Sequence, residues 1–136
     1  MYDNFNFLLD RSDKVEFINY SKCSTCKKAR KFLDSNGIKY EDRQIKENNP
    51  SYGEIKDWIK KYNVSIRKLF NTSGILYRKL NLKNKLENMT NDEMIRLLST
   101  DGMLIKRPIL VSDSYLLVGF KEKDWNVFLV HNKKSN

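Results

Sequence analysis

A chain of 136 residues is long enough to form one domain with a buried core. Its hydrophobic fraction of 40%, with 12% aromatic residues, is normal for a globular protein and argues against wholesale disorder. The formal net charge is +9, but the lysines are spread along the whole chain, which favours codon bias in an AT-rich genome over adaptation to an acidic partner or to nucleic acid.

The N-terminal residues 1–14 precede the first predicted element and are set apart as a leader. They lack both a basic n-region and a small-residue cleavage site, so we do not expect a signal peptide. No run approaches the roughly 18 apolar residues of a membrane helix. We therefore expect a cytoplasmic protein with no membrane partner.

The first predicted elements form a β-α-β unit. The run VEFINY (15–20) is short and largely apolar without clean alternation, which is typical of a strand covered on both faces. A helix follows, with Ser24 or Thr25 as its N-cap and Asn36-Gly37 at its end. The segment IKYEDRQI (38–45) is predicted as a second strand.

Helical patterns fill the middle of the chain. Asn49-Pro50 begins a helix, with proline tolerated in the first turn, and apolar residues recur at helical spacing from Ile55 to Tyr62. Residues 64–99 carry only helical patterns, and the last of these follows a capping box at 90–93. Gly102 is expected to end this region.

The final part returns to strands. MLIKRPILV (103–111) is predicted as a strand interrupted by Pro108, SYLLVGF (114–120) as its hairpin partner, and 122–130 as an amphipathic helix. The order is β-α-β, an all-helical insertion of about residues 64–99, then β-β-α. This is an α/β protein of thioredoxin topology. We expect a single domain at 15–130 and a C-terminal tail at 131–136.

Two cysteines form a C-x-x-C motif at the start of the first helix. The thiolate is the reactive form of cysteine, and a helix N-terminus offers it unpaired N–H groups and a partial positive charge. Cys23, just before the helix, gains most, and the nearby Lys22, Lys27, Lys28 and Arg30 add positive potential. Cys23 is therefore predicted to be a nucleophile with a lowered pKa. Cys26 is predicted to be the resolving thiol with a higher pKa. Two packed, inert thiols are the alternative.

Other uses of the two thiols fit less well. Zinc requires about four ligands, whereas the chain offers two cysteines and one histidine, His131, which is expected to be an exposed tail residue. Two lone cysteines in a reducing cytosol are seldom a structural crosslink. We predict no metal site and no bound cofactor.

Pro108 adds a second part to the predicted site. A proline inside a strand-like run marks an edge, a bulge or a cis bond, and a thioredoxin fold carries a cis-proline loop here, against the active thiols. Arg107 would then point its charge toward Cys23 and could hold a thiolate or an oxyanion. The alternative is an ordinary surface arginine at a strand end. The Arg107–Pro108 bond is predicted to be cis.

Four segments resemble the arsenate reductase family of thioredoxin folds, which also contains the redox-sensing transcription regulator Spx. They are YSKCSTCKKARKFLDSNGIKY, LFNTSGILYRKLNL, DGMLIKRPILV and VGFKEKDW, and the spacing agrees from about residue 15 to residue 130. The resemblance implies that Cys23 matches the cysteine that attacks arsenate and that Arg107 matches one oxyanion-binding arginine. Asn71 and Phe120 stand where two further arginines are expected. Arsenate is therefore expected to be at best a poor substrate.

The favoured interpretation is a thiol–disulfide oxidoreductase that uses Cys23, Cys26 and Arg107. Pro108, Thr72, Ser73 and Gly74 are expected to shape its site. An external thiol, such as thioredoxin, glutaredoxin or a small thiol, is expected to reduce it. The alternative is an Spx-like regulator that binds the C-terminal domain of the RNA polymerase α-subunit without contacting nucleic acid directly. A vestigial, inert relative is the remaining possibility.

Overall fold

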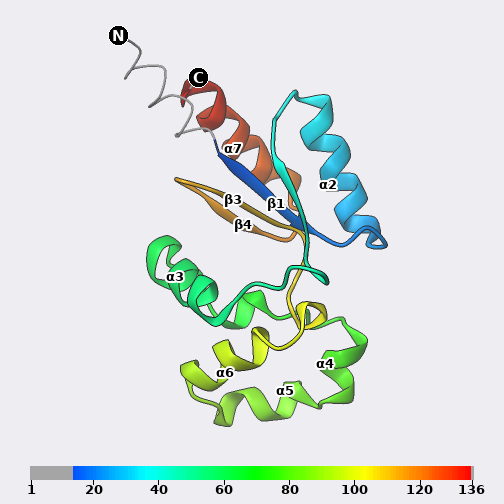
Figure 1. Cartoon of the computed structure of the whole chain (residues 1–136), viewed down its shortest axis with the longest axis vertical. Coiled ribbons are helices and arrows are strands. Elements are labelled where there is room, and N and C mark those ends of the chain that lie inside the picture. Colours follow the sequence, from blue (N-terminus) through cyan, green and yellow to red (C-terminus); the bar gives the residue numbers. More distant parts are fainter. Residues whose placement is uncertain (1–13, 136) are drawn as a thin grey trace.

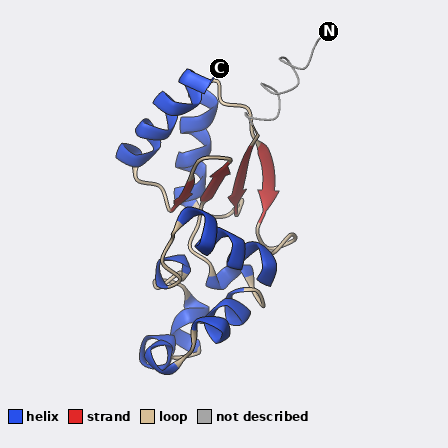
Figure 2. Cartoon of the chain, turned by 90° about the vertical axis from the view of Figure 1, so that its left-hand side faces the viewer, coloured by secondary structure: helices blue, strands red, loops and turns tan. Residues whose placement is uncertain are grey.

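The computed structural model describes residues 14–135, and its mixed α/β architecture is thioredoxin-like (Figures 1 and 2). The first half contains β1 (Val15–Asn19), α2 (Ser24–Ser35), β2 (Glu41–Gln44) and α3 (Tyr52–Tyr62). The insertion contains the 3-10 turn η1 (Arg67–Leu69), α4 (Ile75–Lys79), α5 (Leu82–Lys85), η2 (Leu86–Asn88) and α6 (Asn91–Leu98). The turn η3 (Gly102–Leu104), β3 (Ile109–Ser112), β4 (Leu116–Val118) and α7 (Glu122–Ser135) complete the order.

The four strands form one mixed sheet in the order β2-β1-β3-β4. The central strand β1 runs parallel to β2 and antiparallel to β3, and β3 pairs antiparallel with β4. Parallel β1 and β2 require a crossover connection, which α2 supplies. The predicted β-α-β unit and the helical character of 64–99 are confirmed.

Both faces of the sheet are covered by separate apolar clusters. Phe17 of β1 and Leu110 of β3 pack with α2 and α7 on one face, where Trp125 is fully buried. Their neighbours Ile18 and Ile109 pack on the opposite face with α3 and α6. Successive strand residues point to opposite faces, so burial on both explains why the first strand shows no alternating pattern.

The predicted strand 103–111 is wrong in its first half. Residues 102–104 form η3, and β3 begins only at Ile109, after Pro108. The intervening backbone pairs elsewhere: Asn71 N donates to Leu104 O at 2.8 Å, and Lys106 N donates to Leu69 O at 2.8 Å. Tertiary pairing with the η1 segment therefore takes these residues away from the sheet.

The C-terminal helix is longer than predicted. It continues through Ser135 rather than ending at residue 130, so the segment expected to be a tail is largely helical. His131 is exposed, as expected, but it lies within α7, with its ring 5.1 Å from that of Tyr115. The leader expected at 1–14 lies outside the described residues except for Lys14.

Gly102 supports the junction between the insertion and the sheet through close packing. A Cβ atom there would lie 2.7 Å from Ile45 O and 2.8 Å from Asn49 Oδ1. Gly102→Ala is expected to destabilise the protein by about 1–3 kcal/mol, because the backbone must move to accept the methyl group. Denaturant unfolding measures the change.

Gly53→Ala is the matched control. Gly53 lies exposed in α3, and the nearest atom to a Cβ placed there would be Ser51 Oγ at 4.0 Å. This variant should gain roughly 0.4–1 kcal/mol of stability, because alanine fits at this position in the first turn of α3 and lowers the conformational entropy of the unfolded chain. Equal effects of the two substitutions would contradict the role assigned to Gly102.

Candidate functional site

Cys23 lies where β1 leads into α2, and its own sulfur caps the helix. Its backbone is extended, with φ −93° and ψ 121°, and its Sγ accepts a hydrogen bond from Cys26 N at 3.4 Å. The predicted caps Ser24 and Thr25 are wrong, since both lie inside the first turn. A thiol takes the place that serine or aspartate usually fills at a helix N-terminus.

The two thiols differ in exposure and in acidity. Both are free, and Cys23 is partly exposed whereas Cys26 is only 2% exposed. Burial raises the pKa of the Cys26 thiol to about 12, and the neighbouring Cys23 adds to this rise. Cys26 is therefore a neutral thiol near neutral pH.

The pKa of Cys23 is lowered. Burial alone would raise it, but the hydrogen bonds from Cys26 and the charge of Arg107 together outweigh burial. The direction agrees with the sequence-based prediction for both cysteines. Arg30, however, does not contribute as expected, because its guanidinium pairs with Asp42 at 2.8 Å.

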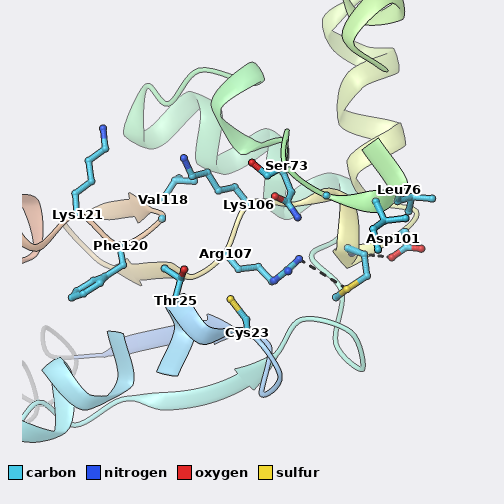
Figure 3. Close-up of a pocket in the computed structure, with 15 residues that line it drawn as sticks. Cys23, Thr25, Ser73, Leu76, Asp101, Lys106, Arg107, Val118, Phe120 and Lys121 are labelled. Carbon is cyan, nitrogen blue, oxygen red and sulfur yellow. Dashed lines mark hydrogen bonds between the residues drawn. The ribbon is translucent and has the colours of Figure 1, made fainter. Parts of the chain in front are cut away.

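Arg107 reaches the thiols from a distant part of the chain. The Arg107–Pro108 peptide bond is cis, as predicted, and Figure 3 shows the Arg107 side chain directed to the space above Cys23. Its guanidinium carbon lies 5.3 Å from the centre of the Tyr20 ring, within cation–π range. Its Nη1 contacts Met103 Sδ at 4.0 Å and Ile105 O at 3.5 Å.

The charge of Arg107 is not neutralised by a carboxylate. Within the part of the chain that the structure describes, no ion pair includes Arg107, and its buried Nε has no hydrogen-bond partner. Buried donors are normally paired. The guanidinium is thus available to an anion that enters beside Cys23, including a leaving thiolate.

Cys23 and Arg107 both line a cavity of about 820 Å³. Ser73 and Gly74 line it, as predicted, and so do Asn71 and Phe120. Thr72 does not line it and instead borders a second hollow of about 430 Å³. Lys121, which the sequence offers as a replacement for the missing charge at Phe120, also lines the cavity. Sequence reasoning missed several other lining residues, namely Thr25, Ile75, Leu76, Asp101, Met103, Lys106, Val118 and Gly119. Lys106, adjacent to Arg107 in the sequence, could have been suspected.

A buried polar network fixes the loop before Cys23. Asn19 ends β1 at 1% exposure, and its Oδ1 accepts hydrogen bonds at 3.0 Å from both Arg30 and Gln44. Gln44 Oε1 in turn accepts from Ser21 N at 3.1 Å. The loop is thereby tied to both β1 and β2. The lone asparagine at the end of an apolar strand was the available signal for this network.

Metal-binding clusters and membrane-spanning helices are both absent from the described residues. Among residues 14–135, no three His, Cys, Asp or Glu side chains gather in a way that could hold a metal ion. None of the helices in the same range is long and apolar enough to span a membrane.

Arg107→Met should raise the pKa of Cys23, because the thiolate loses a nearby positive charge. In a Cys26→Ser background, the alkylation rate should then reach its midpoint at higher pH than in the parent. Lys28→Met removes an equal charge from the exposed side of α2 and is expected to leave the midpoint nearly unchanged. Equal shifts in the two variants would show that the general positive field, rather than Arg107, favours the thiolate.

Comparisons with known proteins agree with this fold and identify the family. Over 108 residues the chain is 47% identical to the uncharacterized protein YusI of Bacillus subtilis, covering 79% of this chain and 92% of YusI. It is 28% identical to the global transcriptional regulator Spx of Bacillus subtilis over 113 residues, covering 83% and 85% of the two chains.

A solved structure of an ArsC family related protein from Bacteroides fragilis has a TM-score of 0.81 and 45% identity, covering 85% of this chain and 98% of that one. The model of the ArsC family matches residues 18–128, which include both cysteines, Arg107 and the helical insertion. The chain therefore belongs to the ArsC family.

Proposed function

We propose that the protein is a cytoplasmic thiol–disulfide oxidoreductase in which Cys23 is the nucleophile and Cys26 the resolving thiol. The contrast between the two thiols carries this proposal. Cys23 opens onto the cavity with a lowered pKa, whereas Cys26 is buried behind it with a pKa raised to about 12. Because Cys23 lines the cavity together with Arg107, an external disulfide can reach its sulfur, which distinguishes this pair from two packed, inert thiols.

The first step forms a mixed disulfide. The Cys23 thiolate attacks one sulfur of a disulfide, and the other sulfur leaves as a thiolate that carries the electron pair of the broken bond. Arg107 lies beside the reacting sulfur with no carboxylate partner in the described ion pairs. Its positive charge favours the thiolates on both sides of this exchange.

The second step uses Cys26. Once Cys23 is bonded to the substrate, its negative charge is gone, which removes one of the causes that raise the pKa of Cys26. Cys26 loses its proton, attacks Cys23 Sγ and releases the substrate as a thiol. Two electrons have then passed to the substrate, and a Cys23–Cys26 disulfide remains. An external thiol of the thioredoxin, glutaredoxin or small-molecule type restores the dithiol.

Arsenate is a poor substrate in this proposal. An oxyanion must be desolvated to reach Cys23, which is costly without paired donors. Asn71 and Phe120 line the cavity, where a neutral amide and an apolar ring replace the charges that the family resemblance leads us to expect. Exchange with a disulfide places no such demand on these two positions.

A second candidate function is an Spx-like regulator. The 28% identity to the regulator Spx over most of both chains favours it. In that case the Cys23–Cys26 disulfide would act as a switch, and the RNA polymerase α-subunit would be the partner. A complex with the α-subunit that forms only with oxidised protein, together with no turnover of disulfides, would favour the regulator over the oxidoreductase.

Cys26→Ser should trap the first intermediate. With a small disulfide as substrate, intact-mass measurement should find a stable adduct on Cys23 in this variant and an internal disulfide in the wild type. Cys23→Ser should give neither product, since the buried thiol cannot react with an external disulfide. Adduct formation on Cys26 in the Cys23→Ser variant would reverse the assigned roles.

Arsenate turnover tests the substrate assignment. If each missing charge-assisted contact is worth roughly 1.5–3 kcal/mol, two of them lower kcat/KM about a hundredfold or more. Asn71→Arg should therefore increase arsenate turnover, while exchange with a neutral disulfide should change far less. Wild-type arsenate reduction at the rate of a dedicated enzyme, abolished by Cys23→Ser, would contradict this assignment.

A further inference from the structure

The cavity that Cys23 lines, called the first hollow below, and the second hollow share one wall and carry an excess of positive charge. Lys106, Val118 and Lys121 line both. We call the five basic residues around the hollows the cationic wall: Arg67, Lys68, Lys106, Arg107 and Lys121. Figure 3 shows Lys121, Lys106 and Arg107 following one another from left to right across the first hollow.

The charges of this wall are not balanced internally. Among the residues that the structure describes, ion pairs use Arg30, Arg43 and Arg96, and none includes a member of the cationic wall. Two carboxylates line the hollows, Asp101 and Asp124, and Asp101 Oδ1 already accepts a hydrogen bond from Met103 N at 2.9 Å. The two hollows together, called the groove below, therefore present a net positive surface that is open to an acidic ligand.

Lys106 joins the two hollows because of Gly119. Gly119 has φ +77°, and a Cβ atom there would lie 2.9 Å from Lys106 Cε. The aliphatic part of Lys106 thus lies directly over the Gly119 backbone. Lys106 is an exposed residue, and from this position it lines both hollows.

The second hollow favours an extended polypeptide over a small anion. It lies between the η1 segment and β4, lined by Arg67 and Lys68 on one side and by Leu116 and Leu117 on the other. In the described sheet β4 is an edge strand, with β3 as its partner and its other side unpaired. An edge strand offers backbone donors and acceptors to an added strand. The first hollow also has an apolar rim, where Ile75 is 73% exposed.

We propose that this groove docks an extended, acidic segment of a partner protein whose disulfide-bonded cysteine is the substrate of Cys23. The inference rests on the proposed thiol–disulfide exchange and specifies its substrate class. Carboxylates of the segment pair with the cationic wall along the second hollow. Its cysteine reaches Cys23 in the first hollow.

The test compares two peptides that differ only in charge. Each is an eight-residue peptide with a central cysteine bonded to 2-thiopyridine, and the flanking residues include either glutamates or glutamines. Cys23 attacks the peptide sulfur, and 2-thiopyridone leaves with the electron pair of the broken bond and takes a proton from solvent. Its absorbance gives the rate of the first step in the wild-type protein.

The acidic peptide should react about tenfold faster than the neutral one at low ionic strength, because opposite charge steers the encounter. The advantage should shrink toward onefold at about 0.5 M salt. In the double variant Arg67→Glu/Lys68→Glu, the rate advantage of the acidic peptide should be lost or reversed at low salt. The control is the double variant Lys31→Glu/Lys39→Glu, which changes the net charge equally at two exposed lysines outside the groove. In this control the rate advantage of the acidic peptide should persist.

The outcomes separate this inference from the proposed function. Equal rates for the two peptides would overturn the acidic-segment assignment and leave the exchange chemistry standing. No reaction with either peptide would overturn both. A short single-stranded oligonucleotide that inhibits more strongly than a cysteine-free acidic peptide would assign the groove to nucleic acid instead.

Discussion

The hydrogen bond from the Cys26 backbone to the Cys23 sulfur is the contact on which the site depends. It makes Cys23, the proposed nucleophile, the cap of α2, so the position of the sulfur and the start of the helix are fixed together. The free N–H groups at a helix start favour an acceptor with negative charge, and a thiolate is such an acceptor. The same geometry holds Cys26 one turn inside the helix, where burial keeps its proton in place.

The rest of the fold brings a charge to that cap from far along the chain. Residues 104–106 pair with the η1 segment instead of extending β3, and this pairing places Arg107 over the thiol. The helical insertion supplies the opposite wall through Ser73 and Gly74. On the other side, Asn19 and Gln44 hold the loop before Cys23 with buried polar contacts. The site is therefore assembled from segments at both ends of the domain and from the insertion between them.

Local patterns were sufficient to place the cysteine pair at the start of a helix and to predict the β-α-β unit, and the thioredoxin topology added the cis bond before Pro108. One error was local, in the choice of the helix cap, and the others arose where distant segments decide the outcome. Thiols are unusual helix caps, so Ser24 and Thr25 were the more natural choice. Arg30 of α2 pairs with Asp42 of β2, a contact that the local sequence around the cysteines does not reveal. Thr72 follows Asn71 and precedes Ser73 directly, and only the path of the loop decides which hollow each residue lines.

The capping role of Cys23 also sets a thermodynamic bias. Only the reduced protein contains the anion that the helix start and Arg107 favour, and closing the disulfide removes it. Every contact that lowers the pKa of Cys23 therefore shifts the thiol–disulfide equilibrium of the protein toward the dithiol. A dithiol favoured in this way gives up its electrons less readily than the same pair without these contacts. In the proposed exchange, this bias favours acceptors that are strong oxidants, such as strained or exposed disulfides, over the stable structural disulfides of other proteins.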